Sequence, residues 1–178
     1  DFDGKPLLSS VDIHTAKKAV IEALPLADAA PLLDATGRAR FVRGFGADGR
    51  VAVMWRPAAE WVAFEPAGFR PGTVAPQRIT PDGRSLLLIG TRTDEALSGL
   101  YRFDLETGAV TTVLTDPDAD IERVVTDLAG DAVIGVRVHA DRPRHHWLDP
   151  EDATTKLYDM MERAFPDQFV SFTSATAD

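Results

Sequence analysis

A faint internal repeat constrains this chain more than any other sequence feature. The segment Ser9–Pro25 and the segment Leu100–Pro117 carry similar residues in the same order, and Leu8, Asp12 and Thr15 recur at an offset of ninety-two positions. The identical pairs are Leu8/Leu100, Asp12/Asp104, Thr15/Thr107, Pro25/Pro117, Ala27/Ala119 and Asp28/Asp120. A second echo places Asp-Gly-Arg before apolar residues at 48–50 and again at 82–84. Self-similarity of this kind predicts an architecture built from repeated units.

The repeated units read as short strands joined by tight turns. Apolar residues alternate with other residues over 51–55, 101–105 and 134–138, and 86–89 is a short continuous apolar run. Gly83 and Gly108 can supply the positive φ that tight turns need, and Gly108 predicts a hairpin of 99–105 with 109–114. Short strands in a repeat predict an all-β fold, a partial β-propeller of about three to four blades of antiparallel strands.

The repeat and the turns divide the chain into four expected units. They are a remnant blade at 1–37 with an outer hairpin at 7–24, a blade at 38–73, a blade at 74–117, and a blade at 118–178 that carries a helical insertion. Asp149 followed by Pro150 predicts the start of one short helix near 150–165. Its predicted apolar face consists of Leu157, Met160, Met161, Ala164 and Phe165. A strand is expected after it, at 169–173.

Composition narrows the classes of partner. Nineteen Lys and Arg against twenty-eight Asp and Glu give a net charge of −9, so no nucleic-acid partner is expected. No run approaches the roughly 18 apolar residues of a membrane span. There is no cysteine, so disulfides are excluded, and the compartment stays open between cytoplasm and periplasm. The chain starts in mid-pattern, and we expect it to be a fragment of a longer protein.

Two segments carry a family resemblance. Residues 77–88, Q-R-I-T-P-D-G-R-S-L-L-L, and 99–108, G-L-Y-R-F-D-L-E-T-G, resemble the propeller repeat of TolB-type proteins. The segment 145–150, H-H-W-L-D-P, which leads to K-L-Y at 156–158, is similar to the propeller region of bacterial serine peptidases of the prolyl oligopeptidase family, the dipeptidyl-aminopeptidase and acylaminoacyl-peptidase kind. The resemblance implies a propeller that caps a C-terminal α/β-hydrolase domain of the same protein.

The chain lacks the nucleophile that such a peptidase needs. No Gly-x-Ser-x-Gly turn occurs in the sequence, so we assign no catalytic residue and expect the chain to be inactive alone. No cofactor is expected. The acids at 116–120 lack the Gly and Glu of a calcium loop at its sixth and twelfth positions, and the adjacent His145 and His146 would point to opposite faces of a strand, so no metal site is assigned.

Candidate binding residues follow from the resemblance alone. The segment around 144–147 would form a blade edge facing the cavity between propeller and hydrolase domain. That placement implies a substrate-facing role for Arg144, His145 and Trp147, whereas packing within the blade is the alternative.

Two functions remain open at this point. One is a non-catalytic propeller domain that gates and docks peptide substrates for the hydrolase domain. The other is a stand-alone TolB-like propeller for protein–protein interaction. In either case, blades that do not close into a ring have open strand edges, so a homodimer formed through these edges is expected.

Overall fold

The computed structural model describes residues 6–172 and is mostly β-structure, with 46% of the chain in strands. The strands form four antiparallel sheets, and one short helix follows them within the described residues. No barrel closes among these residues. The predicted all-β class with one short helix is therefore confirmed.

The sheets follow the order of the chain. The first sheet pairs β1 (Leu7–Val11) with β2 (Lys18–Ala23). The second contains β3 (Ala27–Leu33), β4 (Ala39–Phe45), β5 (Val51–Trp55) and β6 (Val62–Ala63), and the third contains β7 (Ala75–Ile79), β8 (Ser85–Thr91), β9 (Ser98–Asp104) and β10 (Val110–Leu114). The fourth contains β11 (Asp120–Thr126), β12 (Val133–His139) and β13 (Arg144–Trp147), and helix α1 (Ala153–Ala164) follows it.

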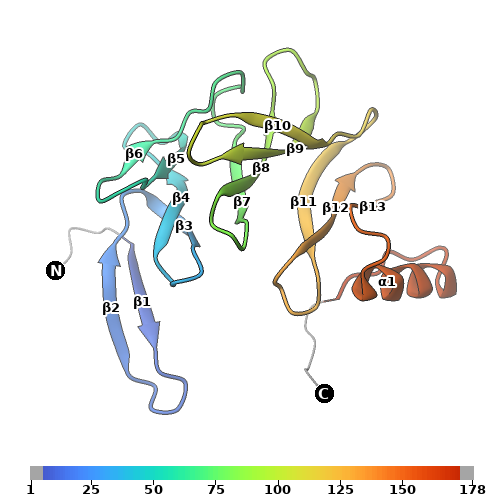
Figure 1. Ribbon diagram of the computed structural model, residues 1–178, viewed down its shortest axis with the longest axis horizontal. Coiled ribbons are helices and arrows are strands. Elements are labelled where there is room, and N and C mark those ends of the chain that lie inside the picture. Colours follow the sequence, from blue (N-terminus) through green and yellow to red (C-terminus); the bar gives the residue numbers. More distant parts are fainter. Residues whose placement is uncertain (1–5, 173–178) are drawn as a thin grey trace.

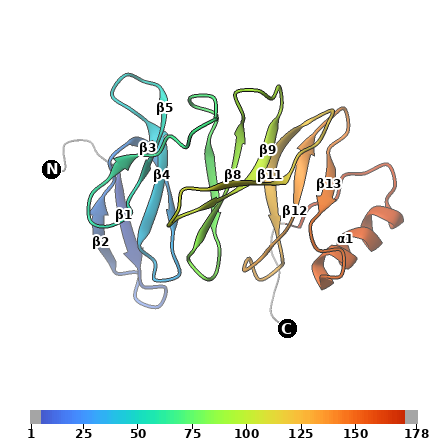
Figure 2. The same cartoon turned by 45° about the horizontal axis from the view of Figure 1, so that its top comes forward.

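The four sheets follow one another around an open arc. The arc runs from β1 and β2 at one end to β13 and α1 at the other (Figure 1). In the second, third and fourth sheets, the first strand lies on the concave side of the arc and the later strands lie progressively further out. When the molecule is turned by 45°, the sheets stand side by side in a row, with α1 beyond β13 (Figure 2).

Strand β8 shows why a continuous apolar run suits this arrangement. Leu86 and Leu88 belong to the apolar cluster shared with the second sheet, whereas Leu87 and Ile89 belong to the cluster shared with the fourth. All four side chains are buried. Since successive side chains of a strand point to opposite faces, a strand between two sheets must be apolar on both faces. The predicted hairpin of 99–105 with 109–114 is confirmed by the pairing of β9 with β10.

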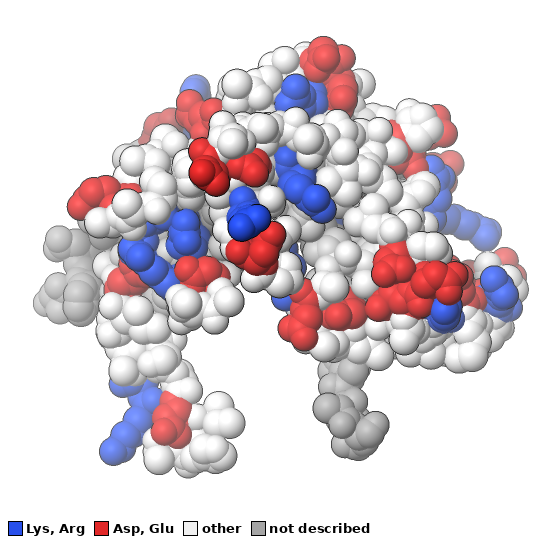
Figure 3. Space-filling model, in the orientation of Figure 1, with Lys and Arg blue, Asp and Glu red and all other residues white. Residues whose placement is uncertain are grey.

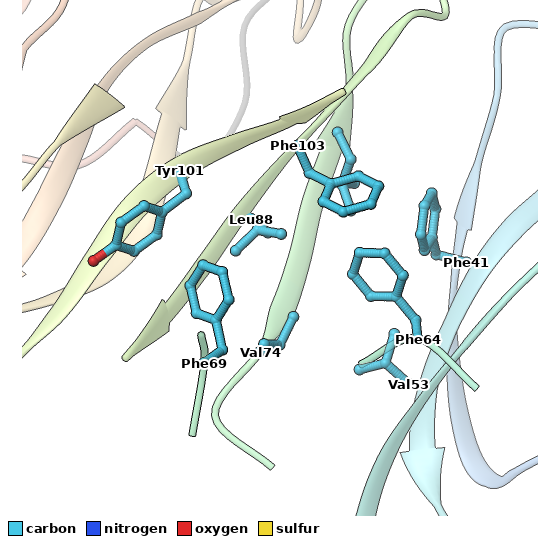
Figure 4. Packing of buried hydrophobic residues seen from close by; sticks show 9 residues of the cluster. Phe41, Val53, Phe64, Phe69, Val74, Leu88, Tyr101 and Phe103 are labelled. Carbon is cyan, nitrogen blue, oxygen red and sulfur yellow. The ribbon is translucent and has the colours of Figure 1, made fainter. Parts of the chain in front are cut away.

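Aromatic rings fill the layer between the second and third sheets (Figure 4). The Phe64 ring lies edge-on to Phe41 at 5.1 Å and to Phe103 of β9 at 5.0 Å, measured between ring centroids. Separate apolar clusters join the first sheet to the second, around Leu24 and Val42, and the third to the fourth. Each pair of neighbouring sheets therefore has an apolar layer of its own, and the arc is held by contacts between neighbours.

The sheets differ from the predicted units at one boundary. Strand β3 begins at Ala27 and pairs with β4, so the predicted boundary between 37 and 38 falls inside a hairpin of the second sheet. The residues of β3, A-D-A-A-P-L-L, do not alternate between apolar and polar, which hid the strand from a periodicity argument. The outer hairpin predicted at 7–24 corresponds to β1 and β2, and the predicted unit 74–117 encloses β7–β10.

The echo of Asp-Gly-Arg does not mark equivalent turns. Residues 48–50 join the second and third strands of their sheet, whereas residues 82–84 join the first and second strands of theirs. The turn equivalent to Gly83 contains Gly37 in the second sheet and Gly130 in the fourth, and all three glycines have a positive φ of 70–78°. Their spacing indicates a unit of about 46 residues, so the ninety-two-residue repeat spans two units.

Helix α1 begins later and buries a different face than predicted. Its N-cap is Asp152, whose carboxylate accepts from the backbone N–H groups of Thr154 and Thr155, so Asp149 and Pro150 lie before the helix. The buried residues are Thr154, Thr155 and Tyr158, whereas Met160 and Phe165 of the predicted apolar face are exposed. The strand expected at 169–173 is also wrong over 169–172, and residue 173 lies outside the described residues.

Candidate functional site

The three candidate residues Arg144, His145 and Trp147 all lie on strand β13, and the strand separates them. Because side chains alternate along a strand, Arg144 and His146 point to one face of the fourth sheet, whereas His145 and Trp147 point to the other. The first pair reaches Asp116 in the loop before β11. The second pair packs against α1. The structure therefore brings His145 and Trp147 together and places Arg144 elsewhere.

Asp116 anchors the face of β13 that carries Arg144. The Arg144 guanidinium lies 3.0 and 2.9 Å from the two carboxylate oxygens, and His146 Nε2 lies 2.7 Å from Oδ2. The hydrogen bond from Arg144 is the main cause that lowers the pKa of Asp116 to about 2, against the opposing effect of burial. The same contact raises the pKa of Arg144. This cluster ties the loop after β10 to β13.

His145 lies in an aromatic cluster on the opposite face. Its side chain is 3% exposed, and its Nδ1 lies 2.8 Å from Oε1 of Glu162 on α1. Its ring stacks on Trp147 at a centroid distance of 4.8 Å and contacts the rings of Tyr158 and Phe169 at 5.1 and 5.0 Å. The packing and the carboxylate together hold the imidazole in one orientation.

A cavity of about 280 Å³ lies beside His145, and we call it the His145 pocket. Residues 123–130, from β11 and the turn that follows it, form one wall. The other wall is formed by Arg137, His145, Tyr158, Phe169, Ser171 and Phe172. A hydrogen bond of 3.3 Å from the Phe172 backbone N–H to the Tyr158 hydroxyl ties the segment after α1 to the helix.

Arg123, Arg137 and Asp127 are the charged residues that line the pocket, and Glu122 pairs with both arginines. Arg137 forms a bidentate ion pair with Glu122, and its guanidinium lies 5.3 Å from the centre of the Phe169 ring. Arg123, which also lines the pocket, lies 3.7 Å from the same carboxylate. The hydrogen bond from Arg137 lowers the pKa of Glu122, so this carboxylate is ionised near neutral pH.

The pocket lies at the acidic end of the molecule. Acidic side chains gather over the end that carries α1 (Figure 3), where residues 149–167 hold six Asp or Glu and two Lys or Arg. The arginines that line the pocket therefore lie within an acidic surrounding. No group of three His, Asp or Glu side chains that could hold a metal ion occurs in residues 6–172.

The sequence singled out His145 but not the residues of α1 that contact it. Glu162 and Tyr158 stand four residues apart on α1, so they share one helix face, and that spacing was the available signal. The helix was interpreted from its apolar residues, so Glu162 and Tyr158 were not identified as residues that contact His145. Asp116 was considered only as part of a metal loop, and its contacts with β13 join residues about thirty positions apart.

No family model, curated protein or solved structure matches this chain. Within residues 6–172, the helix is too short and too polar to cross a membrane.

Proposed function

We propose that the four sheets are consecutive blades of a β-propeller, and that this propeller is the non-catalytic part of a serine peptidase of the prolyl oligopeptidase family. In this role it gates and docks peptide substrates for an α/β-hydrolase domain elsewhere in the same protein. The observation that carries the proposal is the strand order: chain order runs from the concave side of the arc outward in each of the last three sheets (Figure 1).

The proposal also accounts for the sheets that have fewer than four strands. The hairpin β1–β2 repeats the sequence of β9–β10 at an offset of ninety-two residues, so it corresponds to the outer half of a blade. In the fourth sheet, α1 follows β13 where the second and third sheets have a fourth strand. The resemblance of residues 77–88 and 99–108 to TolB-type repeats supports the propeller, and that of residues 145–150 and 156–158 to the peptidase propellers supports the parentage.

The residues around β13 support non-covalent binding of a peptide. The sequence contains no Gly-x-Ser-x-Gly turn to expose a nucleophile. His145 borders a cavity and is positioned by Glu162, so it contacts the docked peptide in this proposal. Trp147 supports the imidazole by stacking, and Arg144 is engaged by Asp116 on the other face.

The reading frame around this segment provides the first test. We expect it to continue into a strand, a Gly-x-Ser-x-Gly turn and a helix. We also expect the purified chain to leave aminoacyl-nitroanilides intact. A frame that ends without this turn contradicts the peptidase role. If the isolated chain hydrolyses these substrates and a serine reagent abolishes the activity, then the proposal that this chain is non-catalytic is wrong.

A second function is favoured by the exposed apolar residues of the first sheet. Val11, Ile13, Val20 and Ile21 on β1, β2 and their turn are 57%, 88%, 48% and 53% exposed. Exposed apolar residues gathered in this way mark surfaces that bind other proteins. The second proposal is therefore a stand-alone propeller that recruits a protein partner through this hairpin. A reading frame without a hydrolase domain favours it over the first.

A further inference from the structure

The His145 pocket presents one hydrogen-bond acceptor of defined orientation. His145 Nδ1 lies 2.8 Å from Oε1 of Glu162, and a carboxylate oxygen accepts, so the tautomer of the imidazole that fits this contact has its N–H on Nδ1. Nε2 then carries the lone pair. Nε2 has no hydrogen-bond partner in residues 6–172, and it is not among the buried unpaired atoms of this region. The Nδ1 edge is turned to Glu162, which leaves the Nε2 edge for the cavity.

The walls of the pocket favour a flat apolar group. The rings of Tyr158, Phe169 and Phe172 line the cavity beside the imidazole. Ring faces and edges of this kind pack best against another aromatic ring. The cavity of about 280 Å³ is slightly smaller than the roughly 300–1,000 Å³ of sites for whole small-molecule ligands, so it suits a single side chain.

The charges of the pocket argue against an ionic ligand. Arg123 and Arg137 line the cavity together with one acidic residue, Asp127, so the positive charges outnumber the negative one and disfavour a cation. Both arginines share the Glu122 carboxylate, which offsets their attraction for an anion. An unprotonated Nε2 also repels a carboxylate, because both would be acceptors. A neutral donor on an aromatic ring is the chemistry that fits all three features.

We propose that the His145 pocket binds one aromatic side chain with a hydrogen-bond donor, a tyrosine phenol or a tryptophan indole, of a docked peptide. The donor bonds to His145 Nε2, and the ring packs against Tyr158, Phe169 and Phe172. Glu162 is a positioning residue, since it fixes the tautomer without touching the ligand. This inference rests on the proposed function, because it takes a peptide as the source of the side chain.

The test compares two ligands that differ by one hydroxyl group. N-acetyl-tyrosinamide and N-acetyl-phenylalaninamide are titrated into the full chain at pH 8, with the backbone amide signals of residues 124–130 followed by NMR. One neutral hydrogen bond predicts that the tyrosine amide binds about fivefold more tightly. Equal affinity of the two amides for the wild-type chain, or signal changes confined to other residues, overturns the inference.

Variants separate the acceptor from the shape of the pocket. His145→Phe keeps a ring but removes Nε2, so the two amides should bind equally well to it. Glu162→Ala should weaken the preference, and Glu162→Gln should retain it, because the amide oxygen can still accept from Nδ1. His14→Phe in the exposed β1–β2 turn is the matched control and should bind as the wild type does. A fivefold preference that persists in His145→Phe overturns the inference.

A second probe distinguishes failure of the pocket proposal from failure of the proposed function. The pentapeptide Gly-Pro-Ala-Gly-Ala carries no aromatic ring and serves as the second probe. If it binds the chain while neither amide binds, the pocket proposal fails and a peptide-docking role stands. If the tyrosine preference is found but the reading frame lacks a hydrolase domain, the pocket stands and the peptidase role fails.

Discussion

Asp12 and Asp104 make the same hydrogen bonds in two turns that lie ninety-two residues apart. The Oδ1 atom of Asp12 accepts from the backbone N–H groups of His14 and Thr15, at 2.9 and 2.8 Å. The Oδ1 atom of Asp104 accepts from those of Glu106 and Thr107, at 3.0 and 2.7 Å. In both cases these bonds lower the pKa of the aspartate. The sequence repeat is therefore a repeat of turn chemistry.

The two turns differ at the residue that takes a positive φ. Gly108 occupies this position after Asp104 with φ of 73°, whereas Ala16 occupies it after Asp12 with φ of 55°. An alanine Cβ makes this conformation costly, and glycine adopts it freely. We expect Ala16→Gly to raise the free energy of unfolding by about 0.5–1 kcal/mol and Gly108→Ala to lower it by about 1 kcal/mol. Urea denaturation of both variants measures the two changes.

The two variants are controls for each other, because their expected changes in the free energy of unfolding have opposite signs. The nearest atom to a Cβ built at Gly108 is Phe103 Cζ at 4.0 Å, so a clash would not explain a loss in Gly108→Ala. A loss of stability in Ala16→Gly would contradict the equivalence of the two turns.

The ion pair between Asp116 and Arg144 should make the stability of the fold depend on pH in the acidic range. Its pKa is lowered to about 2 in the folded chain, chiefly by Arg144, from an ordinary value of 3.8. A lowered folded-state pKa gives stability that is fully present above pH 4 and is lost as the pH falls toward 2. We expect Asp116→Asn to lower the free energy of unfolding by about 2 kcal/mol at pH 7. The difference in free energy of unfolding between Asp116→Asn and the wild type should disappear between pH 4 and pH 2.

Chemical denaturation across this pH range provides the measurement. Asp118→Asn is the matched control, because Asp118 lies in the same loop and is exposed. A gap between Asp116→Asn and the wild type that stays constant down to pH 2 would rule out the ion pair as its cause.

A buried ion pair joins the first sheet to the second. Arg56 is 8% exposed, and its guanidinium lies 2.6 and 2.8 Å from the two carboxylate oxygens of Glu22 on β2. It also donates to the Ala39 carbonyl. Removing Glu22 leaves the buried Arg56 charge without its partner, so we expect Glu22→Ala to lower the free energy of unfolding by about 3 kcal/mol. Replacing both residues, as in Glu22→Leu with Arg56→Met, should recover most of this loss.

Hydrogen exchange locates the effect of this pair. Backbone amides of β1 and β2 should exchange faster in Glu22→Ala, while those of β8 and β9 should keep their protection. Glu106→Ala in the exposed β9–β10 turn is the control. A uniform loss of protection over all four sheets would show that the pair stabilises the whole molecule and does not act as a local clamp.

Open strand edges and exposed apolar residues predict self-association through the first sheet. Ile13 is 88% exposed at the tip of the β1–β2 hairpin, and Val11 is 57% exposed on β1. Such surfaces pair with a second chain. We expect light scattering to show a dimer at micromolar concentration and Val11→Lys with Ile13→Lys to convert it to a monomer. A stable monomer of the wild-type chain would contradict this expectation.

The sequence by itself determined most of the strands, the turns and the repeat, because these depend on nearby residues. Alternating apolar residues, the Pro81-Asp82-Gly83 turn and the Asp104–Gly108 hairpin act within a few positions of one another, and the structure has these elements. Where the local signal was weak, as in β3 with Pro31, the strand was missed. The N-cap of α1 was misplaced by three residues because Asp149 and Asp152 are both suitable caps.

Only the tertiary structure decided which side chains meet around β13. The pairing of β13 with β12 sends His145 toward Glu162 and His146 toward Asp116, although the two histidines are adjacent in the chain. The partners lie seventeen and thirty residues away. No local pattern encodes these distances, because they depend on how the fourth sheet packs against α1 on one face and against the third sheet on the other.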